Sequence, residues 1–283
     1  MKKFGYIDKS GSTVISPQFD YAFGFSEGLA GVEIDEVGGF IDKQGKFIIP
    51  LQYGGASIFT EGLSSICFKD GKCGYIDKTG KITIPPSFCE TSEFIDGLAY
   101  VRTETTKGYI NTEGEWVFTE KDGTHLYPFL SEGFCRIDVW DEKEEHYAGY
   151  IDMTGEIVIK PQFEHAYEFS EGYACVETKD GRDVFIDKTG QEVLELKFEM
   201  SHSYFFEGLV SVKVNGKYGF ADKSGELVIE PRFDGAMLFS EGLAAVKIDE
   251  KYGYIGKAGE WVIEPIFRYA ERFSEGLAAV KFM

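Results

Sequence analysis

The sequence predicts an all-β fold built from one unit that is repeated in tandem along the whole chain. Three observations lead to this prediction. The phrase Phe-Ser-Glu-Gly-Leu-Ala-Ala-Val-Lys occurs at residues 239–247 and 273–281, and looser copies precede it at intervals of about 35 residues. Glycine (34 residues) and aromatic residues (16%) are abundant, which is typical of many strands joined by tight turns. No segment shows the apolar period of an amphipathic helix.

Two series of glycines mark eight repeats. One glycine ends a four-residue turn that starts with Asp in most repeats, and it falls at Gly11, Gly45, Gly80, Gly114, Gly155, Gly190, Gly225 and Gly259. The other belongs to a Ser-Glu-Gly step and falls at Gly28, Gly62, Gly97, Gly133, Gly172, Gly208, Gly242 and Gly276. Because the two series interleave from end to end, residues 1–283 are predicted to form a single repeat domain.

Each repeat begins with a short strand-prone segment, such as residues 5–9, followed by the Asp-x-x-Gly turn. The Asp can hydrogen-bond the backbone of this turn, and the glycine tolerates a positive φ. A second strand, such as residues 12–15, comes next. It is predicted to end at a proline such as Pro17, because proline lacks the N–H needed to continue a ladder.

The connector that follows carries two aromatic anchors in most repeats. The first anchors are Phe19, Tyr53, Phe88, Phe163, Phe198, Phe233 and Phe267, and the second are Phe25, Phe59, Phe94, Phe169, Phe205, Phe239 and Phe273, with Leu130 in the fourth repeat. One repeat cannot bury these rings alone, so stacked repeats are predicted to share a continuous aromatic core. A third strand follows Ser-Glu-Gly and turns back through hairpin loops such as Asn215-Gly216. The unit is therefore read as a three-stranded meander plus a connector.

The repeats can be arranged in two ways. Three strands are one short of a four-stranded propeller blade, and an insertion in the fourth repeat breaks the symmetry, so we predict an open β-solenoid-like superhelix. The alternative is a closed, propeller-like ring in which the N- and C-terminal strands pair, which would remove the need for polar end caps. The two arrangements differ in whether residues 2–8 and 277–283 lie side by side.

Residues 251–282 (Lys-Tyr-Gly-Tyr-Ile…Phe-Ser-Glu-Gly-Leu-Ala-Ala-Val-Lys-Phe) resemble the bacterial WG repeat, also called the KWG repeat, and the resemblance extends over all eight units. It implies an interaction module with no enzyme chemistry and no cofactor. The namesake Trp is missing, and its position holds Phe4, Gly38, Cys73, Lys107, Ala148, Asp183, Tyr218 and Tyr252. If that Trp is a ligand platform in relatives, only Phe4, Tyr218 and Tyr252 could replace it here.

The sequence contains no catalytic, cofactor-binding or metal-binding motif, and we predict none of these sites. One acid recurs in each Ser-Glu-Gly step: Glu27, Glu61, Asp96, Glu132, Glu171, Glu207, Glu241 and Glu275. Such a row could bind cations or a basic partner. Its coupling to the repeat favours a structural role instead, in which each carboxylate accepts backbone N–H groups at the tight connector.

Charge and cysteine content limit the partners and the compartment. The net charge of −19 repels nucleic-acid phosphates, and no apolar run is long enough to span a bilayer. The N-terminal lysines are not followed by the apolar stretch of a signal peptide. The five cysteines (Cys67, Cys73, Cys89, Cys135 and Cys175) are scattered, with Cys67 and Cys73 expected to sit diagonally across a hairpin. All five are predicted to be reduced thiols of a cytoplasmic protein.

The fourth repeat departs most from the pattern and supplies the candidate binding site. Its hairpin is extended by a segment that contains Trp140, Asp141, Glu142, Glu144, Glu145, His146 and Tyr147. A Trp among acids on an exposed hairpin is a plausible recognition patch, whereas the alternative is a tolerated surface insertion. We therefore predict a non-catalytic scaffold that binds a protein or peptide. Binding of a carbohydrate or another small ligand through exposed aromatics remains the alternative function.

Overall fold

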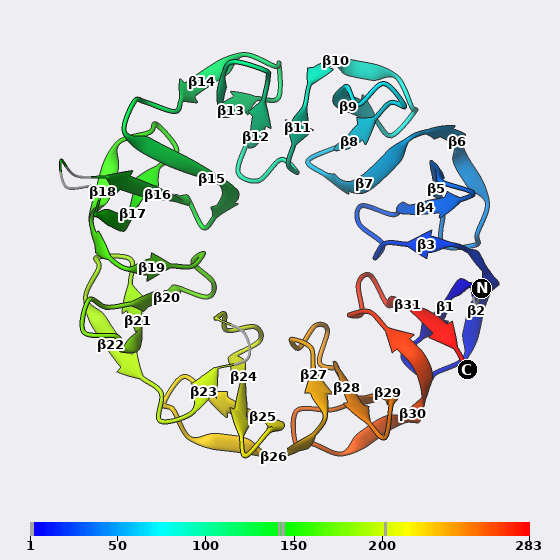
Figure 1. The fold of residues 1–283 in the computed structure, drawn as a ribbon. Coiled ribbons are helices and arrows are strands. Elements are labelled where there is room, and N and C mark those ends of the chain that lie inside the picture. Colours follow the sequence, from blue (N-terminus) through cyan, green and yellow to red (C-terminus); the bar gives the residue numbers. More distant parts are fainter. Residues whose placement is uncertain (1–2, 141, 143–144, 201–202) are drawn as a thin grey trace.

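The computed structural model describes residues 3–140, 142, 145–200 and 203–283, and every element in these ranges is a strand. The strands form a closed ring of four-stranded antiparallel blades, which Figure 1 shows end on. Six separate four-stranded sheets form blades 2 to 7. A seven-stranded sheet, β2-β1-β31-β30-β29-β28-β27, forms blades 8 and 1, which are joined through the long strand β30. The ring therefore has eight blades, one for each repeat of the sequence.

The strand bounds repeat from blade to blade. Blade 1 consists of the end of β30 (Trp261–Ala270), β31 (Leu277–Phe282), β1 (Phe4–Asp8) and β2 (Thr13–Phe19). Blade 2 consists of β3 (Tyr21–Ala22), β4 (Ala30–Ile34), β5 (Val37–Ile41) and β6 (Phe47–Tyr53). Blade 3 consists of β7 (Gly55–Thr60), β8 (Leu63–Cys67), β9 (Cys73–Asp77) and β10 (Ile82–Phe88). Blade 4 consists of β11 (Glu90–Thr91), β12 (Leu98–Arg102), β13 (Lys107–Asn111) and β14 (Trp116–Thr119).

The second half of the ring follows the same order. Blade 5 consists of β15 (Thr124–Ser131), β16 (Phe134–Trp140), β17 (His146–Asp152) and β18 (Ile157–Phe163). Blade 6 consists of β19 (His165–Ala166), β20 (Tyr173–Glu177), β21 (Asp183–Asp187) and β22 (Glu192–Glu195). Blade 7 consists of β23 (Glu199–Met200), β24 (Leu209–Val214), β25 (Lys217–Asp222) and β26 (Leu227–Phe233). Blade 8 consists of β27 (Gly235–Ala236), β28 (Ala244–Ile248), β29 (Lys251–Ile255) and the start of β30.

The two ends of the chain close the ring. Strands β1 and β31 pair from Phe4↔Lys281 to Asp8↔Leu277, so the N- and C-terminal strands share blade 1. The closed ring is confirmed, and the prediction of an open superhelix is wrong. The error came from counting three strands in each repeat. The connector supplies a fourth, innermost strand, which in blade 2 is only the two-residue β3 and shows no alternation that a sequence pattern could reveal.

The outermost strand explains two fixed residues of the repeat. Strand β2 does not end at Pro17 as predicted but continues to Phe19, because the proline lies on an edge strand where no partner needs its N–H. The register between β1 and β2 shifts around this proline, from Tyr6↔Ile15 to Phe4↔Phe19. A Cβ on Gly5 would lie 2.5 Å from the Ile15 carbonyl oxygen. The glycine is therefore required because the shifted outer strand presses directly against it.

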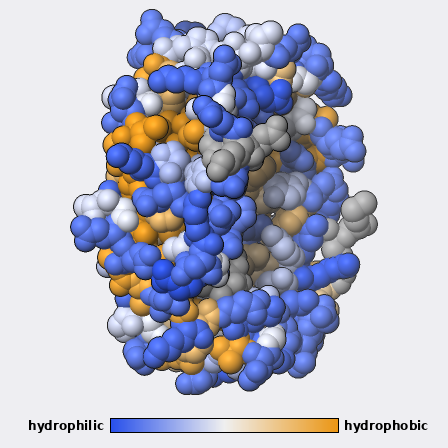
Figure 2. Space-filling model, turned by 60° about the vertical axis from the view of Figure 1, so that its left-hand side comes forward, coloured by the Kyte–Doolittle hydropathy of each residue, from blue (hydrophilic) through white to orange (hydrophobic). Residues whose placement is uncertain are grey.

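The aromatic anchors form the core, as predicted. The second anchors are all nearly inaccessible to solvent, and in blade 2 Phe25 packs 4.9 Å from the ring of Tyr6. Tyr6 is itself buried and donates its hydroxyl to the Phe23 carbonyl oxygen over 2.8 Å, which satisfies its polar end. The outer strands instead expose apolar residues: Val14, Ile48, Val117, Val158, Val193, Val228 and Val262. Figure 2 shows apolar areas of this kind among hydrophilic residues on the outer wall.

Two cysteines contradict the prediction of five reduced thiols. Cys67 and Cys73 are direct cross-strand partners on β8 and β9 and form a disulfide, with Cα atoms 4.0 Å apart. The prediction failed because the loop 68–72 places the two residues opposite each other and not diagonally. Cys89, Cys135 and Cys175 are free. Since disulfides are rare in reducing compartments, the cysteines no longer support the expected cytoplasmic location. In the ranges that the structure describes, no helix has the length and apolar character needed to cross a membrane.

Candidate functional site on the hairpin rim

The ring has two rims of different character. Because neighbouring strands are antiparallel, alternate connections of a blade lie at the same end. The turn rim carries the Ser-Glu-Gly turns and the Asp-x-x-Gly turns. The hairpin rim carries the hairpins between the second and third strands, such as Ile34–Val37 in blade 2, and the crossings to the next blade. Each blade therefore contributes two turns to one rim and a hairpin and a crossing to the other.

Polar groups of the turn rim hold neighbouring blades together. The carboxylate of Glu27 accepts the backbone N–H of Gly62 in the next blade at 3.0 and 3.3 Å and pairs with Lys78 at 2.9 Å. The same carboxylate-to-glycine bond is made by Glu61, Glu132, Glu171, Glu207, Glu241 and Glu275. The interpretation of the acid row as backbone acceptors is confirmed for these seven residues, with the refinement that the donor belongs to the following blade.

Ionisation of three of these carboxylates, Glu27, Glu207 and Glu241, is favoured by their partners. Burial alone would raise the pKa of Glu207, but the ion pair with Lys257 and the N–H group of Gly242 outweigh it, and the pKa is lowered. The same balance of burial, lysine and glycine lowers the pKa of Glu27 and Glu241. Across the described part of the chain, no three His, Cys, Asp or Glu residues are grouped so that they could hold a metal ion.

One junction on this rim lacks these bonds. Between blades 4 and 5 the acid is Asp96, which is one methylene shorter, and Ile95 stands in place of the serine. At five other junctions a serine donates to a carbonyl oxygen of the next blade, as Ser26 does to Phe59 at 2.6 Å, whereas Thr60 and Phe206 hold this position in blades 3 and 7. Among the described residues, neither bond links blade 4 to blade 5. The junction between blades 4 and 5 therefore departs most from the bonding pattern of the turn rim.

The hairpin rim is chemically variable. At the hairpin rim, one residue from each of the first three strands of a blade pairs side by side with its neighbour. We call these three residues the rim rung of the blade. The rungs of blades 1 to 8 are Tyr269-Lys281-Phe4, Tyr21-Glu33-Gly38, Gly55-Cys67-Cys73, Glu90-Arg102-Lys107, His125-Asp138-Ala148, His165-Glu177-Asp183, Glu199-Lys213-Tyr218 and Gly235-Lys247-Tyr252. The residue that precedes the rim rung on the second strand of each blade is always Val or Ile, as at Val280 and Ile137. The repeat thus keeps its core and varies its hairpin rim.

The family model for the WG containing repeat matches seven stretches of the chain: residues 4–37, 39–73, 74–104, 149–182, 185–218, 218–252 and 252–282. The chain belongs to the WG-repeat family. Residues 105–148, which include the outer half of blade 4 and the first two strands of blade 5, lie outside the matches. This part of the WG-repeat ring contains the extended hairpin that the sequence singles out.

Solved structures share the fold of this WG-repeat protein at low sequence identity. A eukaryotic initiation factor superposes with a TM-score of 0.61 and 11% identity, over 96% of this chain and 87% of that one. BamB from Moraxella catarrhalis superposes with a TM-score of 0.51 and 11% identity, over 100% of this chain and 92% of that one. A search of curated proteins gives no match.

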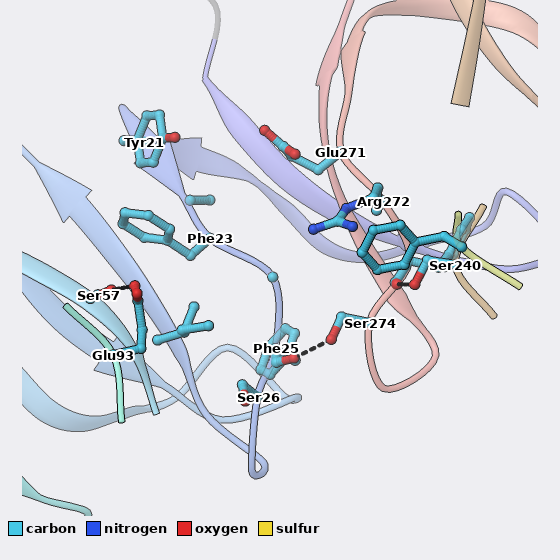
Figure 3. A pocket seen from close by; sticks show the side chains of 15 residues that line it. Tyr21, Phe23, Phe25, Ser26, Ser57, Glu93, Ser240, Glu271, Arg272 and Ser274 are labelled. Atoms are coloured by element: carbon cyan, nitrogen blue, oxygen red, sulfur yellow. Dashed lines mark hydrogen bonds between the residues drawn. The ribbon is translucent and has the colours of Figure 1, made fainter. Parts of the chain in front are cut away.

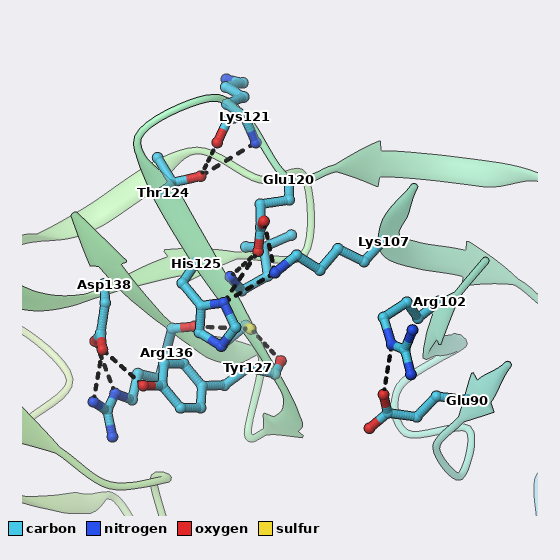
Figure 4. A network of polar contacts seen from close by, with 12 residues as sticks. Glu90, Arg102, Lys107, Glu120, Lys121, Thr124, His125, Tyr127, Arg136 and Asp138 are labelled. Atoms are coloured by element: carbon cyan, nitrogen blue, oxygen red, sulfur yellow. Dashed lines mark hydrogen bonds and ion pairs between the residues drawn. The ribbon is translucent and has the colours of Figure 1, made fainter. Parts of the chain in front are cut away.

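Blade 5 holds a buried charge network under its hairpin. Among the described residues, Asp138 is the one Asp, Glu, His, Lys or Arg that is buried, with 2% of its surface exposed. It accepts a hydrogen bond from the Tyr127 hydroxyl at 2.7 Å and two from Arg136 at 2.9 and 3.0 Å, as Figure 4 shows. His146 Nε2 lies 3.3 Å from the same carboxylate. Burial and the hydrogen bond to Asp138 raise the pKa of Tyr127 to about 12, so this hydroxyl stays protonated as a donor.

The network positions an aromatic patch on the hairpin. Trp140 and His146 are cross-strand partners, with ring centroids 6.0 Å apart, and Trp140 is 44% exposed. The His146 ring also lies 5.8 Å from that of His165 on blade 6. Lys179 Nζ lies 3.3 Å from the centroid of the Tyr147 ring. Since Arg136 Nη1 also donates to the Ala166 carbonyl oxygen of blade 6, the patch spans two blades on a common support.

A second network joins blades 4 and 5 on the same rim. Glu120 pairs with Lys107 at 2.8 Å and lies 3.4 Å from His125 Nδ1, and it also accepts the N–H of Leu126 at 2.8 Å. These contacts, seen in Figure 4, bridge the junction that the turn rim leaves unbridged. Blade 5 is therefore held to its neighbour through its hairpin rim.

The structure brings together part of the predicted site. Trp140, His146 and Tyr147 lie on paired strands, Glu145 accepts a hydrogen bond from the Tyr147 hydroxyl at 2.7 Å, and Glu142 is exposed. Asp141 and Glu144 lie outside the described residues. Sequence reasoning missed the supporting residues Tyr127, Arg136, Asp138, His165 and Lys179. The available signal was Arg-Ile-Asp at residues 136–138, where the repeat ending the chain reads Ala-Val-Lys.

The centre of the ring contains a separate cavity of about 400 Å³. Its polar wall is mostly engaged: Ser274 donates to the Phe25 carbonyl oxygen and Ser57 donates to Glu93 at 2.7 Å (Figure 3). The Arg272 guanidinium lies 5.4 Å from the centroid of the Phe206 ring.

Proposed function

We propose that this WG-repeat ring is a non-catalytic interaction module that binds a protein or peptide partner at blade 5 of its hairpin rim. The observation that carries the proposal is the coincidence of two departures from the repeat. Residues 105–148 lie outside the family matches, and the same stretch supplies the buried Asp138 network. Burying a charge is costly unless it is paired and hydrogen-bonded, so such a network needs a reason beyond packing.

The exposed groups suit a protein surface. Trp, Tyr and Arg dominate the binding energy of protein interfaces, and Trp140 presents a large ring on a rigid support. The neighbouring Glu142 and Glu145 are exposed, which favours a partner segment that combines apolar and basic side chains. The same aromatic surface is the basis for the alternative of glycan binding, and the test below includes it.

The test uses two matched tryptophans. A library of displayed peptides is selected on the wild-type ring, and enriched peptides are then measured against Trp140→Ala and Trp116→Ala. Trp116 is 40% exposed but lies on the outer strand β14, away from the hairpin. We expect Trp140→Ala to weaken binding about 30-fold, as for a hot-spot residue of about 2 kcal/mol, and Trp116→Ala to have little effect. Equal effects, or binding to a glycan array without any enriched peptide, would contradict the proposal.

A further inference from the structure

The opposite side of the hairpin rim carries a groove of different chemistry. Two adjacent pockets of about 440 and 370 Å³ lie at blades 8, 1 and 2, and both are lined by Arg268 and Tyr269. The first also contains Tyr252, and the second contains Phe4, Tyr21 and Lys281. Phe4 and Tyr252 occupy the position of the family's namesake Trp, so two of the three aromatic replacements in this chain meet at one groove.

The groove walls are aromatic and positively charged. Tyr269 packs edge-on against both Phe4 and Tyr252, at 5.9 and 5.8 Å between ring centroids. Tyr21 of blade 2 packs 5.7 Å from Phe4. Lys281 Nζ lies 4.3 Å from the centroid of the Phe4 ring. Aromatic faces flanked by cations are thus presented along the boundary between blades.

Two of the cations have no acidic partner. Within the described part of the chain, neither Arg268 nor Lys281 forms an ion pair, although the protein carries a net charge of −19. The acid lining the groove, Glu250, is paired with Lys247 at 2.8 Å. Glu271, next to the groove, accepts the Tyr269 hydroxyl at 2.7 Å. The lining therefore presents two cations, Arg268 and Lys281, that form no ion pair with a described residue.

We propose that this groove binds a short peptide segment in which a carboxylate side chain stands next to an aromatic one. The carboxylate pairs with Arg268 and Lys281, since a guanidinium presents a planar pair of donors to a carboxylate. The neighbouring aromatic ring packs against Tyr269 and Tyr252 or Tyr21. Two adjoining pockets fit consecutive side chains of a peptide better than one compact ligand. The site lies across the ring from blade 5 and goes beyond the function proposed there.

The test measures binding of four probes by calorimetry. The first is the peptide acetyl-Phe-Glu-Phe-Glu-amide, the second replaces Glu by Gln, the third replaces Phe by Gly, and the fourth is phenylacetate. We expect only the first peptide to bind well, and more weakly as salt is raised. The double variant Arg268→Gln, Lys281→Gln should bind it about tenfold or more weakly. Lys69→Gln, which removes an exposed lysine elsewhere on the rim, should leave binding unchanged.

Each other outcome overturns the inference. Equal binding of the Gln peptide would exclude recognition of charge, and equal binding of phenylacetate would assign the groove to small aromatic acids. Unchanged affinity in the double variant would exclude this groove. Loss of binding in Trp140→Ala, with the double variant unaffected, would place the peptide at blade 5 and support only the function proposed above. The side chains of Arg268 and Lys281 both reach solvent, so we expect the double variant to fold. If its melting temperature is lowered, a Tyr269→Ala variant provides a second test, and we expect Tyr269→Ala to lose peptide binding as well.

Discussion

The turn rim predicts that removing one carboxylate of the acid row loosens the ring by a measurable amount. Glu241 of blade 8 accepts the N–H of Gly276 in blade 1 at 3.1 and 3.3 Å and pairs with Lys9 at 3.0 Å. A hydrogen bond to a charged acceptor is worth about 1.5–3 kcal/mol when buried. The Glu241 side chain is 29% exposed, and an exposed ion pair adds less than about 1 kcal/mol. We expect Glu241→Ala to lower the free energy of unfolding by about 1–2 kcal/mol.

Asp96 is the matched control for this substitution. It occupies the same position of the repeat and has nearly the same backbone, with φ of 51° against 54° for Glu241. Among the described residues, Asp96 makes no side-chain hydrogen bond to the next blade. Alanine therefore has a similar backbone effect at both sites, and Asp96→Ala should cost less than about 0.5 kcal/mol. Urea unfolding monitored by circular dichroism measures both differences from the midpoints, provided that the slopes agree. Equal losses in the two variants would refute the assignment of the carboxylates as links between blades.

Three further predictions test the fold. Gly149→Ala should lower the free energy of unfolding by about 1–3 kcal/mol, because the added Cβ would lie 2.6 Å from the backbone nitrogen of Pro161. Gly55 has open space around it, so Gly55→Ala should leave the urea midpoint unchanged. Cys67→Ser should lower the unfolding free energy by about 2 kcal/mol in the absence of reductant, since it opens a short disulfide loop, and a reduced wild type should match it. The pKa values of several carboxylates, including Glu27 and Asp222, are lowered in the folded protein, so these groups stabilise the fold at pH values above their ordinary pKa. We therefore expect the urea midpoint to fall as the pH drops below about 4.5. A midpoint that stays constant down to about pH 3 would contradict this expectation.

The sequence revealed the parts of the fold that repeat with a period, and it missed those that depend on one or two residues. The strand at residues 5–9, the turn after it and the aromatic anchors such as Phe25 follow from composition and spacing. The innermost strand β3 has only two residues, too few to show an alternating pattern, so the predicted strand count is one short and favours the open superhelix. The strand continues past Pro17 because it lies at the free edge of the blade, and that edge exists only once the blade has assembled.

The candidate site was predicted in its exposed part only. Trp140 and His146 stood out because they interrupt the repeat. Their support does not show in the sequence, because Tyr127, Arg136 and His146 come from three different strands and meet only at Asp138. The groove at Arg268 was missed for the same reason, since it forms only when the N- and C-terminal strands pair in blade 1.

Cohesion between blades is assigned to the turn rim and recognition to the hairpin rim, and hydrogen exchange tests this division most directly. Backbone exchange is measured by mass spectrometry on the ring alone and with a saturating peptide selected on the wild type. We expect the peptide to slow exchange in blade 5 around residues 134–140 and 146–152 and to leave the Ser-Glu-Gly turns, such as residues 26–28 and 240–242, unchanged. Protection confined to those turns or to the central cavity would contradict it.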